Sequence, residues 1–81
     1  MVTNLIVVGD SMNEMNAGQN LAKKLPHCVL KLIKLTEQPN ARELIKQLNV
    51  IKASWEKIST ASRNFNMMLE RKKKWTIIEI V

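Results

Sequence analysis

The strongest structural signal in the chain is the run Asn4-Leu5-Ile6-Val7-Val8-Gly9-Asp10-Ser11-Met12-Asn13-Glu14. Four consecutive apolar residues, half of them valine, predict a short strand that is covered on both faces, as in a parallel sheet. Gly9 permits a sharp exit from that strand. Ser11 and Glu14 have the Ser-x-x-Glu spacing of a capping box, so we expect a helix to begin directly after Ser11.

The next segments extend this start into a β-α-β unit over residues 1–39. Apolar residues at spacings of three and four predict a helix over about residues 12–25, which Pro26 ends because the residue before a proline avoids helical angles. Gly18 within that helix costs up to ~1 kcal/mol relative to alanine, which a close approach of helix to strand would explain. A second strand is expected over residues 28–35, parallel to the first and joined to it by a right-handed crossover.

The second half of the chain reads as one long helix followed by a strand. Asn40 and Glu43 repeat the capping pattern. After them, eight residues are spaced alternately by four and three: Leu44, Leu48, Ile51, Trp55, Ile58, Ser62, Phe65 and Leu69. This heptad seam predicts a helix over residues 40–74, either broken near residues 59–62 or projecting onto another molecule. The β-prone residues 75–81 form a candidate strand, so the whole chain (1–81) reads as one small module.

Strand–Gly9-Asp10-Ser11-x-x-Glu14 and the helix after it resemble the fourth motif of the haloacid dehalogenase-like superfamily. A looser resemblance reaches about residue 70. The resemblance implies an α/β fold with a partial Rossmann-like β-α-β-α unit, to which the sequence pattern adds the long second helix and the candidate C-terminal strand. It also implies that Asp10 and Glu14 hold Mg²⁺. The family's nucleophile motif, Asp-x-Asp, is absent, since Asp10 is the only aspartate. The chain therefore resembles the C-terminal part of such a domain, or a degenerate relative retained for binding.

The residues themselves leave the role of the two acids open. Asp10 lies where a strand ends, which is where α/β sheets bind ligands, and Glu14 lies one helical turn further on. Together they could bind a hard cation such as Mg²⁺. Equally, Asp10 can hold the turn while Glu14 completes the helix cap.

Positive charge is concentrated in the second half of the chain. The 13 Lys and Arg against 7 Asp and Glu give a net charge of +6. The densest cluster is a basic patch formed by Arg71, Lys72, Lys73 and Lys74. Such a patch could bind nucleic-acid phosphates or an acidic protein surface, or it could simply be a solvated turn. Nucleic acid is not favoured, because tyrosine is absent and aromatic residues make up only 4% of the chain.

Four apolar residues are candidates for a protein interface: Trp55, Phe65, Met68 and Leu69. In this interpretation the distal half of the long helix and the terminal strand contact a protein partner, although each residue could also belong to the core. No apolar run is long enough to span a membrane. Cys28 is the only cysteine, so no internal disulfide can form, which favours an intracellular, cytoplasmic location.

The leading functional hypothesis is a non-catalytic, structural protein-interaction module without a cofactor, a subunit or fragment of a larger assembly. One alternative is the Mg²⁺-binding part of a haloacid dehalogenase-like phosphohydrolase whose nucleophile segment lies elsewhere. A second alternative is a basic, RNA-associated subunit of the ribosomal type.

Overall fold

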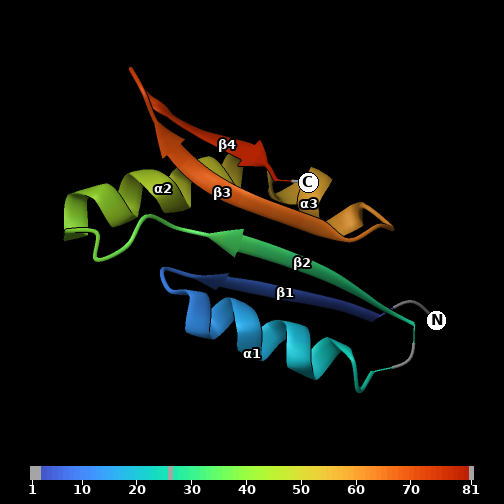
Figure 1. Cartoon of the computed structure of the whole chain (residues 1–81). Helices are drawn as coiled ribbons and strands as arrows, with labels where there is room; N and C mark the ends of the chain where they lie inside the picture. Colours follow the sequence, from blue (N-terminus) through green and yellow to red (C-terminus); the bar gives the residue numbers. More distant parts are fainter. Residues whose placement is uncertain (1–2, 26, 81) are drawn as a thin grey trace.

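The computed structural model describes residues 3–25 and 27–80 as an α/β fold built on one four-stranded sheet (Figure 1). The elements follow in the order β1 (Thr3–Gly9), α1 (Met12–Ala22), β2 (Cys28–Lys34), α2 (Ala41–Ala53), α3 (Trp55–Thr60), β3 (Phe65–Arg71) and β4 (Trp75–Glu79). The strand order is β1-β2-β3-β4. The first three strands are parallel and β4 is antiparallel to β3, so the sheet is mixed.

The β1–α1–β2 unit forms as the sequence predicts. The helix α1 begins after Ser11, whose backbone N–H donates to the Glu14 carboxylate at 3.4 Å. The strands β1 and β2 are parallel neighbours, and the connection through α1 is right-handed (Figure 1). The helix ends at Ala22, three residues earlier than expected, and Pro26 lies outside the described residues.

Gly18 is the point at which α1 approaches the sheet most closely. A β-carbon at this position would lie 2.7 Å from Cγ2 of Val7 and 3.3 Å from Cδ2 of Leu32. Val7 and Leu32 are register partners on β1 and β2, so both point to the face that α1 covers. The close approach offered as a reason for a mid-helix glycine is therefore confirmed.

The prediction of one long helix over residues 40–74 is wrong. The helix α2 ends at Ala53, and α3 ends at Thr60, inside the segment where a break was expected. Beyond it the chain forms β3, which pairs with β2. Phe65 and Leu69 are four residues apart, a spacing that shares one side of a strand as well as one side of a helix. The sheet decides between the two, because β3 covers the edge of β2 that β1 leaves open. Of the terminal strand expected over residues 75–81, Trp75–Glu79 form β4, and Val81 lies outside the described residues.

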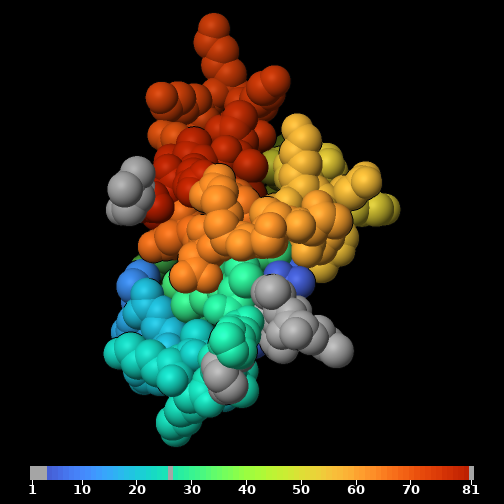
Figure 2. Space-filling model, turned by 90° about the vertical axis from the view of Figure 1, so that its right-hand side faces the viewer, coloured from blue at the N-terminus to red at the C-terminus, as the bar shows by residue number. Residues whose placement is uncertain are grey.

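The helices cover opposite faces of the sheet (Figure 2). The helix α1 packs chiefly on β1 and β2, whereas α2 and α3 pack on the other face. The core beneath α2 and α3 contains Ile33, Leu35, Ile51, Ile58 and Leu69. The step from β2 to β3 runs in the same direction across the sheet as the step from β1 to β2, but its helices lie on the other face. The β2–β3 connection is therefore left-handed, which is the less common hand. Each helical layer therefore leaves part of a sheet face uncovered.

Candidate functional site

The carboxyl ends of β1 and β2 carry the two acids that the sequence singles out. Asp10 and Glu14 line one hollow of about 330 Å³, together with Leu35 and Gln38. A second hollow of about 410 Å³ also includes Asp10 and extends to Glu37. The structure therefore brings Asp10 and Glu14 to one place, as a strand end followed by a helical turn should.

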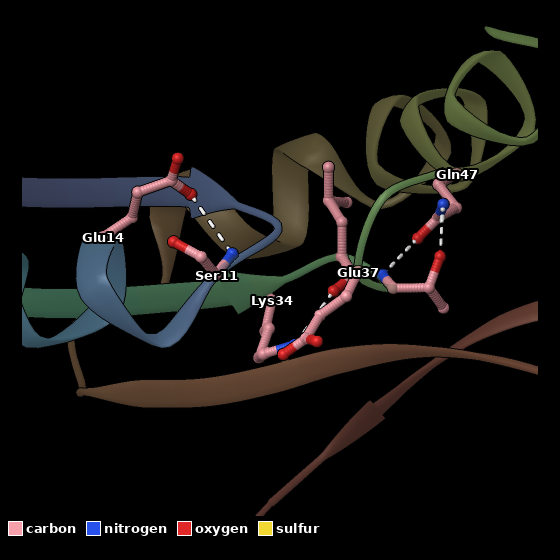
Figure 3. A network of polar contacts seen from close by, with 7 residues as sticks. Ser11, Glu14, Lys34, Glu37 and Gln47 are labelled. Atoms are coloured by element: carbon pink, nitrogen blue, oxygen red, sulfur yellow. Dashed lines mark hydrogen bonds and ion pairs between the residues drawn. The ribbon is translucent and has the colours of Figure 1, made fainter. Parts of the chain in front are cut away.

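Glu14 is already engaged in local structure (Figure 3). Its carboxylate accepts the Ser11 N–H and folds back over Gly9, where it occupies the space of a β-carbon. Within residues 3–25 and 27–80, no three His, Cys, Asp or Glu side chains converge as metal ligands. The donor set at Asp10 and Glu14 is thus two carboxylates, one of which completes a helix cap.

The loop between β2 and α2 lies at the same end of the sheet, directly after the carboxyl end of β2. Gln47 is fully buried, and its amide accepts the Thr36 N–H and donates to the Thr36 hydroxyl, both at 2.9 Å. Lys34 lies 3.7 Å from Glu37 across the loop (Figure 3). Lys34 also donates to the Leu35 carbonyl at 3.3 Å, and these partly buried bonds hold the loop that carries Leu35 and Gln38 of the hollow.

The four residues predicted as one interface do not form one surface. Leu69 is 2% exposed and belongs to the core, so its assignment to a partner interface is wrong. Trp55 is 44% exposed on α3, whereas Phe65 lies under the Arg63 guanidinium, 4.1 Å from the ring centroid. Met68 points to the opposite face of the sheet from Phe65 and Leu69, because successive strand residues alternate sides.

A salt bridge joins the start of β3 to β4 beside Phe65. Arg63 donates two hydrogen bonds to the Glu79 carboxylate, at 2.7 and 3.1 Å. Hydrogen bonding from Arg63 lowers the pKa of Glu79, and the Glu79 carboxylate in turn raises the pKa of Arg63. Arg63 and Glu79 also line a largely apolar groove of about 320 Å³ between α3 and the strands, together with Ile58, Phe65 and other residues.

On the face of the sheet that α1 covers, none of the described helices lies over β3 and β4, and an apolar area is left there. We call it the open face and define it by Met68, Ile78 and Ile80. Met68 and Ile78 are register partners, and Ile78 and Ile80 are each 38% exposed. The sequence predicted the terminal strand, but it did not single out Ile78 and Ile80. Only the register with β3 shows that they share a side with Met68.

The outer edge of β4 carries unused backbone groups. Ile80 N–H donates to the Asn66 carbonyl at 2.6 Å. The backbone N–H and C=O groups of the even-numbered residues of β4 therefore point toward β3. In an antiparallel ladder the bonding direction alternates, which turns the N–H and C=O groups of Trp75, Ile77 and Glu79 outward. Since β4 is at the end of the strand order, this edge and the open face adjoin.

The structure divides the predicted basic patch. Arg71, Lys73 and Lys74 line a hollow of about 360 Å³ on the α2 side of the β3–β4 hairpin. Lys72 instead lies 4.0 Å from Glu70. Lys46 of α2 joins the first three cations in the hollow. Sequence analysis missed Lys46, and the distance of 25 residues along the chain gives no local signal for it.

Comparison with known proteins adds no family to this description. No protein-family model matches the chain, and no curated protein or solved structure is significantly similar to it. None of the helices in the described part of the chain is long and apolar enough to cross a membrane.

Proposed function

We propose that this chain is a non-catalytic protein-interaction module whose partner adds an extended segment along β4 and covers the open face. The observation that carries the proposal is the open face itself. Met68, Ile78 and Ile80 lie side by side on a sheet surface that no helix of the described residues covers. Burying apolar surface of this kind contributes about 25 cal/mol per Å².

The free edge of β4 supports the same mode of binding. Outward-facing N–H and C=O groups at Trp75, Ile77 and Glu79 can pair with an extended segment of another protein. Such a segment would place every second side chain beside Ile78 and Ile80, on the same side of the sheet as the open face, because side chains alternate along a strand. The partner chemistry that fits is therefore a strand with apolar residues on one side.

The proposal departs from the sequence-based expectation in its location. The expected surface was the distal half of a long helix, and that segment is instead β3 with Leu69 in the core. Of the four residues first considered, Met68 is the one that belongs to the open face. The terminal strand keeps the role that was expected of it.

The test compares two lysine substitutions on the same side of β4. Ile78→Lys places a charge in the open face, and Thr76→Lys places the same charge at an exposed polar position two residues away. The tagged chain and both variants are purified from the native source, and the companion is identified by mass spectrometry. It is then reconstituted with the pure chain, and amide exchange is followed at Trp75, Ile77 and Glu79.

We expect a stoichiometric companion with the wild type and with Thr76→Lys, at least tenfold weaker binding with Ile78→Lys, and slowed exchange at the three outward amides. Equal binding by both variants, or a companion that leaves the exchange unchanged, would refute the proposal. Sedimentation of the pure chain distinguishes pairing with a second copy, which would also refute a foreign partner.

A second proposal is Mg²⁺ binding by Asp10 and Glu14, supported by the hollow that both residues line. Mg²⁺ in proteins is often held by one or two carboxylates and several waters. Here the ion would take Glu14 away from the Ser11 N–H, so binding would cost the helix cap. Titration calorimetry with MgCl₂ tests this idea: heat that is lost in Asp10→Asn supports it, and no heat in the wild type excludes it.

A further inference from the structure

The hollow between α2 and the β3–β4 hairpin gathers positive charge from three elements. We call it the basic hollow. It is lined by Lys46 and Asn49 of α2, Arg71 at the end of β3, Lys73 and Lys74 of the hairpin, and Trp75 at the start of β4. Its volume is about 360 Å³, and no acidic side chain is among its lining residues.

The four cations of the basic hollow lack partners within the protein. The ion pairs among the described residues are Lys34–Glu37, Arg63–Glu79 and Lys72–Glu70, and none includes a cation of the hollow. Like charges that line one hollow repel one another, and a bound anion would offset this repulsion. Most surface cations of a folded protein are dispersed, whereas these converge on one concavity.

Trp75 also lines the basic hollow. Its indole N–H is buried without a hydrogen-bond partner in the described part of the chain. Because this N–H has almost no accessible surface, the donors that a ligand can reach in the hollow are those of the cations and of Asn49. Asn49 supplies an amide at the rim of the hollow. The basic hollow therefore contains several donors and a surplus of positive charge, which suits a phosphate oxygen.

The positive surface continues past the hollow, over the tip of the hairpin. Lys73 and Lys74 also line a neighbouring hollow of about 340 Å³, together with Lys72 and Thr76. A single phosphate would fill only one of the two hollows, whereas a chain of phosphates could follow both. We propose that the basic hollow and the hairpin tip bind successive phosphates of a polynucleotide backbone.

The position of Trp75 indicates whether the site would recognise bases or only phosphates. Trp75 packs against the core beneath α2, so its ring is not free to stack on a base. Contacts to phosphates alone carry no sequence information. We therefore expect binding that is indifferent to base sequence and strongly dependent on salt. The basic hollow lies on the α2 side of the sheet, whereas the hollow at the hairpin tip includes Thr76, which shares a side of β4 with Ile78. Neither hollow includes a residue of the open face, so the inference does not rest on the proposed protein partner.

The experiment uses the full chain and a fluorescently labelled single-stranded RNA of twelve nucleotides with mixed sequence. Anisotropy is recorded between 50 and 200 mM KCl. The double variant Lys46→Gln/Lys73→Gln removes two cations of the hollow. The control Lys23→Gln/Lys24→Gln removes the same charge beyond the end of α1, on the far side of the molecule (Figure 1). All four lysines are exposed, so both variants should fold, which circular dichroism verifies.

We expect the affinity of the wild type to fall with salt at a slope of about −2 to −3 in log K against log salt, since each phosphate contact on a single strand contributes about −0.7. The Lys46→Gln/Lys73→Gln variant should bind at least tenfold more weakly, with a slope smaller by about 1.4. The control should stay within about twofold of the wild type. In a Trp55→Phe background, RNA should also change the emission of Trp75.

Three results would overturn the proposal. An equal loss in the two double variants would reduce the effect to net charge. Equally tight binding of an acidic peptide such as oligoglutamate would assign the hollow to a protein partner. Equally tight binding of inorganic pyrophosphate would assign it to free phosphate compounds instead of a polynucleotide.

Discussion

The carboxylate of Glu14 lies over Gly9, in the space that a β-carbon at Gly9 would occupy. The same carboxylate accepts the Ser11 N–H at the start of α1. The strand end and the helix cap are therefore one unit, in which the residue before the turn must be small so that the cap can form. Gly9 is needed here for lack of space and not for its backbone conformation, since neither glycine of the chain has a positive φ.

Gly9→Ala should lower the free energy of unfolding by about 0.5–2 kcal/mol, the usual worth of a helix cap, because Glu14 has to swing away. In a Glu14→Ala background the same substitution should cost much less. Urea denaturation of the four proteins in this cycle measures the coupling between the two positions. Additive losses would contradict the geometry described.

The bonds between Gln47 and Thr36 should be the most sensitive polar contacts of the fold. Gln47→Ala leaves the Thr36 N–H and hydroxyl without their partner in a partly buried loop. We expect a loss of about 1–3 kcal/mol in the free energy of unfolding. Gln19→Ala, at an exposed position of α1, is the matched control and should change stability little or raise it slightly. Similar effects of the two substitutions would show that the loop bonds contribute nothing.

The Arg63–Glu79 pair predicts a pH dependence of stability. The pKa of Glu79 is lower in the folded state than in the unfolded chain, where glutamate has a pKa of about 4.3. Its contribution is therefore complete above about pH 4.3 and is lost as the pH falls through the lower, folded-state value. Since both side chains are exposed, the effect should be small and sensitive to salt.

Thermal unfolding of the wild type and of Glu79→Gln tests this from pH 7 to pH 2.5. The wild type should melt slightly higher at pH 7, and the difference should shrink as the pH falls. A difference that stays constant over the whole range would contradict a contribution from the ionised carboxylate. A Glu70→Gln variant serves as the comparison, because its lysine partner is 4.0 Å away.

Lys31 offers a test of how the sheet tolerates a buried amino group. Its side chain is 0% exposed on β2, and its amino group donates to the Ser59 carbonyl at 3.2 Å. Lys31→Met keeps the packing of the stem and removes a polar amino group that is costly to bury. We expect the methionine variant to be at least as stable as the wild type in urea, and Lys31→Ala to lose about 2–4 kcal/mol through a cavity. A methionine variant less stable than the alanine one would mean that the amino group itself holds α3 in place.

How far the sequence predicts this protein depends on whether the signal is local. Ser11 with Glu14 and Asn40 with Glu43 marked two helix starts correctly, because a cap is formed by residues three apart. The pair Asp10 and Glu14 was brought together for the same reason. By contrast, the interface assigned to Leu69 failed, because burial depends on what the rest of the chain places on top of a residue.

The amino-acid sequence by itself determined the β1–α1–β2 unit, the start of α2 and the final strand, since hydrophobic runs, caps and β-branched residues act within a few positions. Only the tertiary structure decided that residues 65–71 form a strand. Their spacing suits a helix and a strand equally, and the exposed edge of β2 made the strand more favourable. The tertiary structure alone also placed Lys46 beside Lys73 and Met68 beside Ile78 and Ile80, because sheet register and helix packing join residues that no local pattern relates.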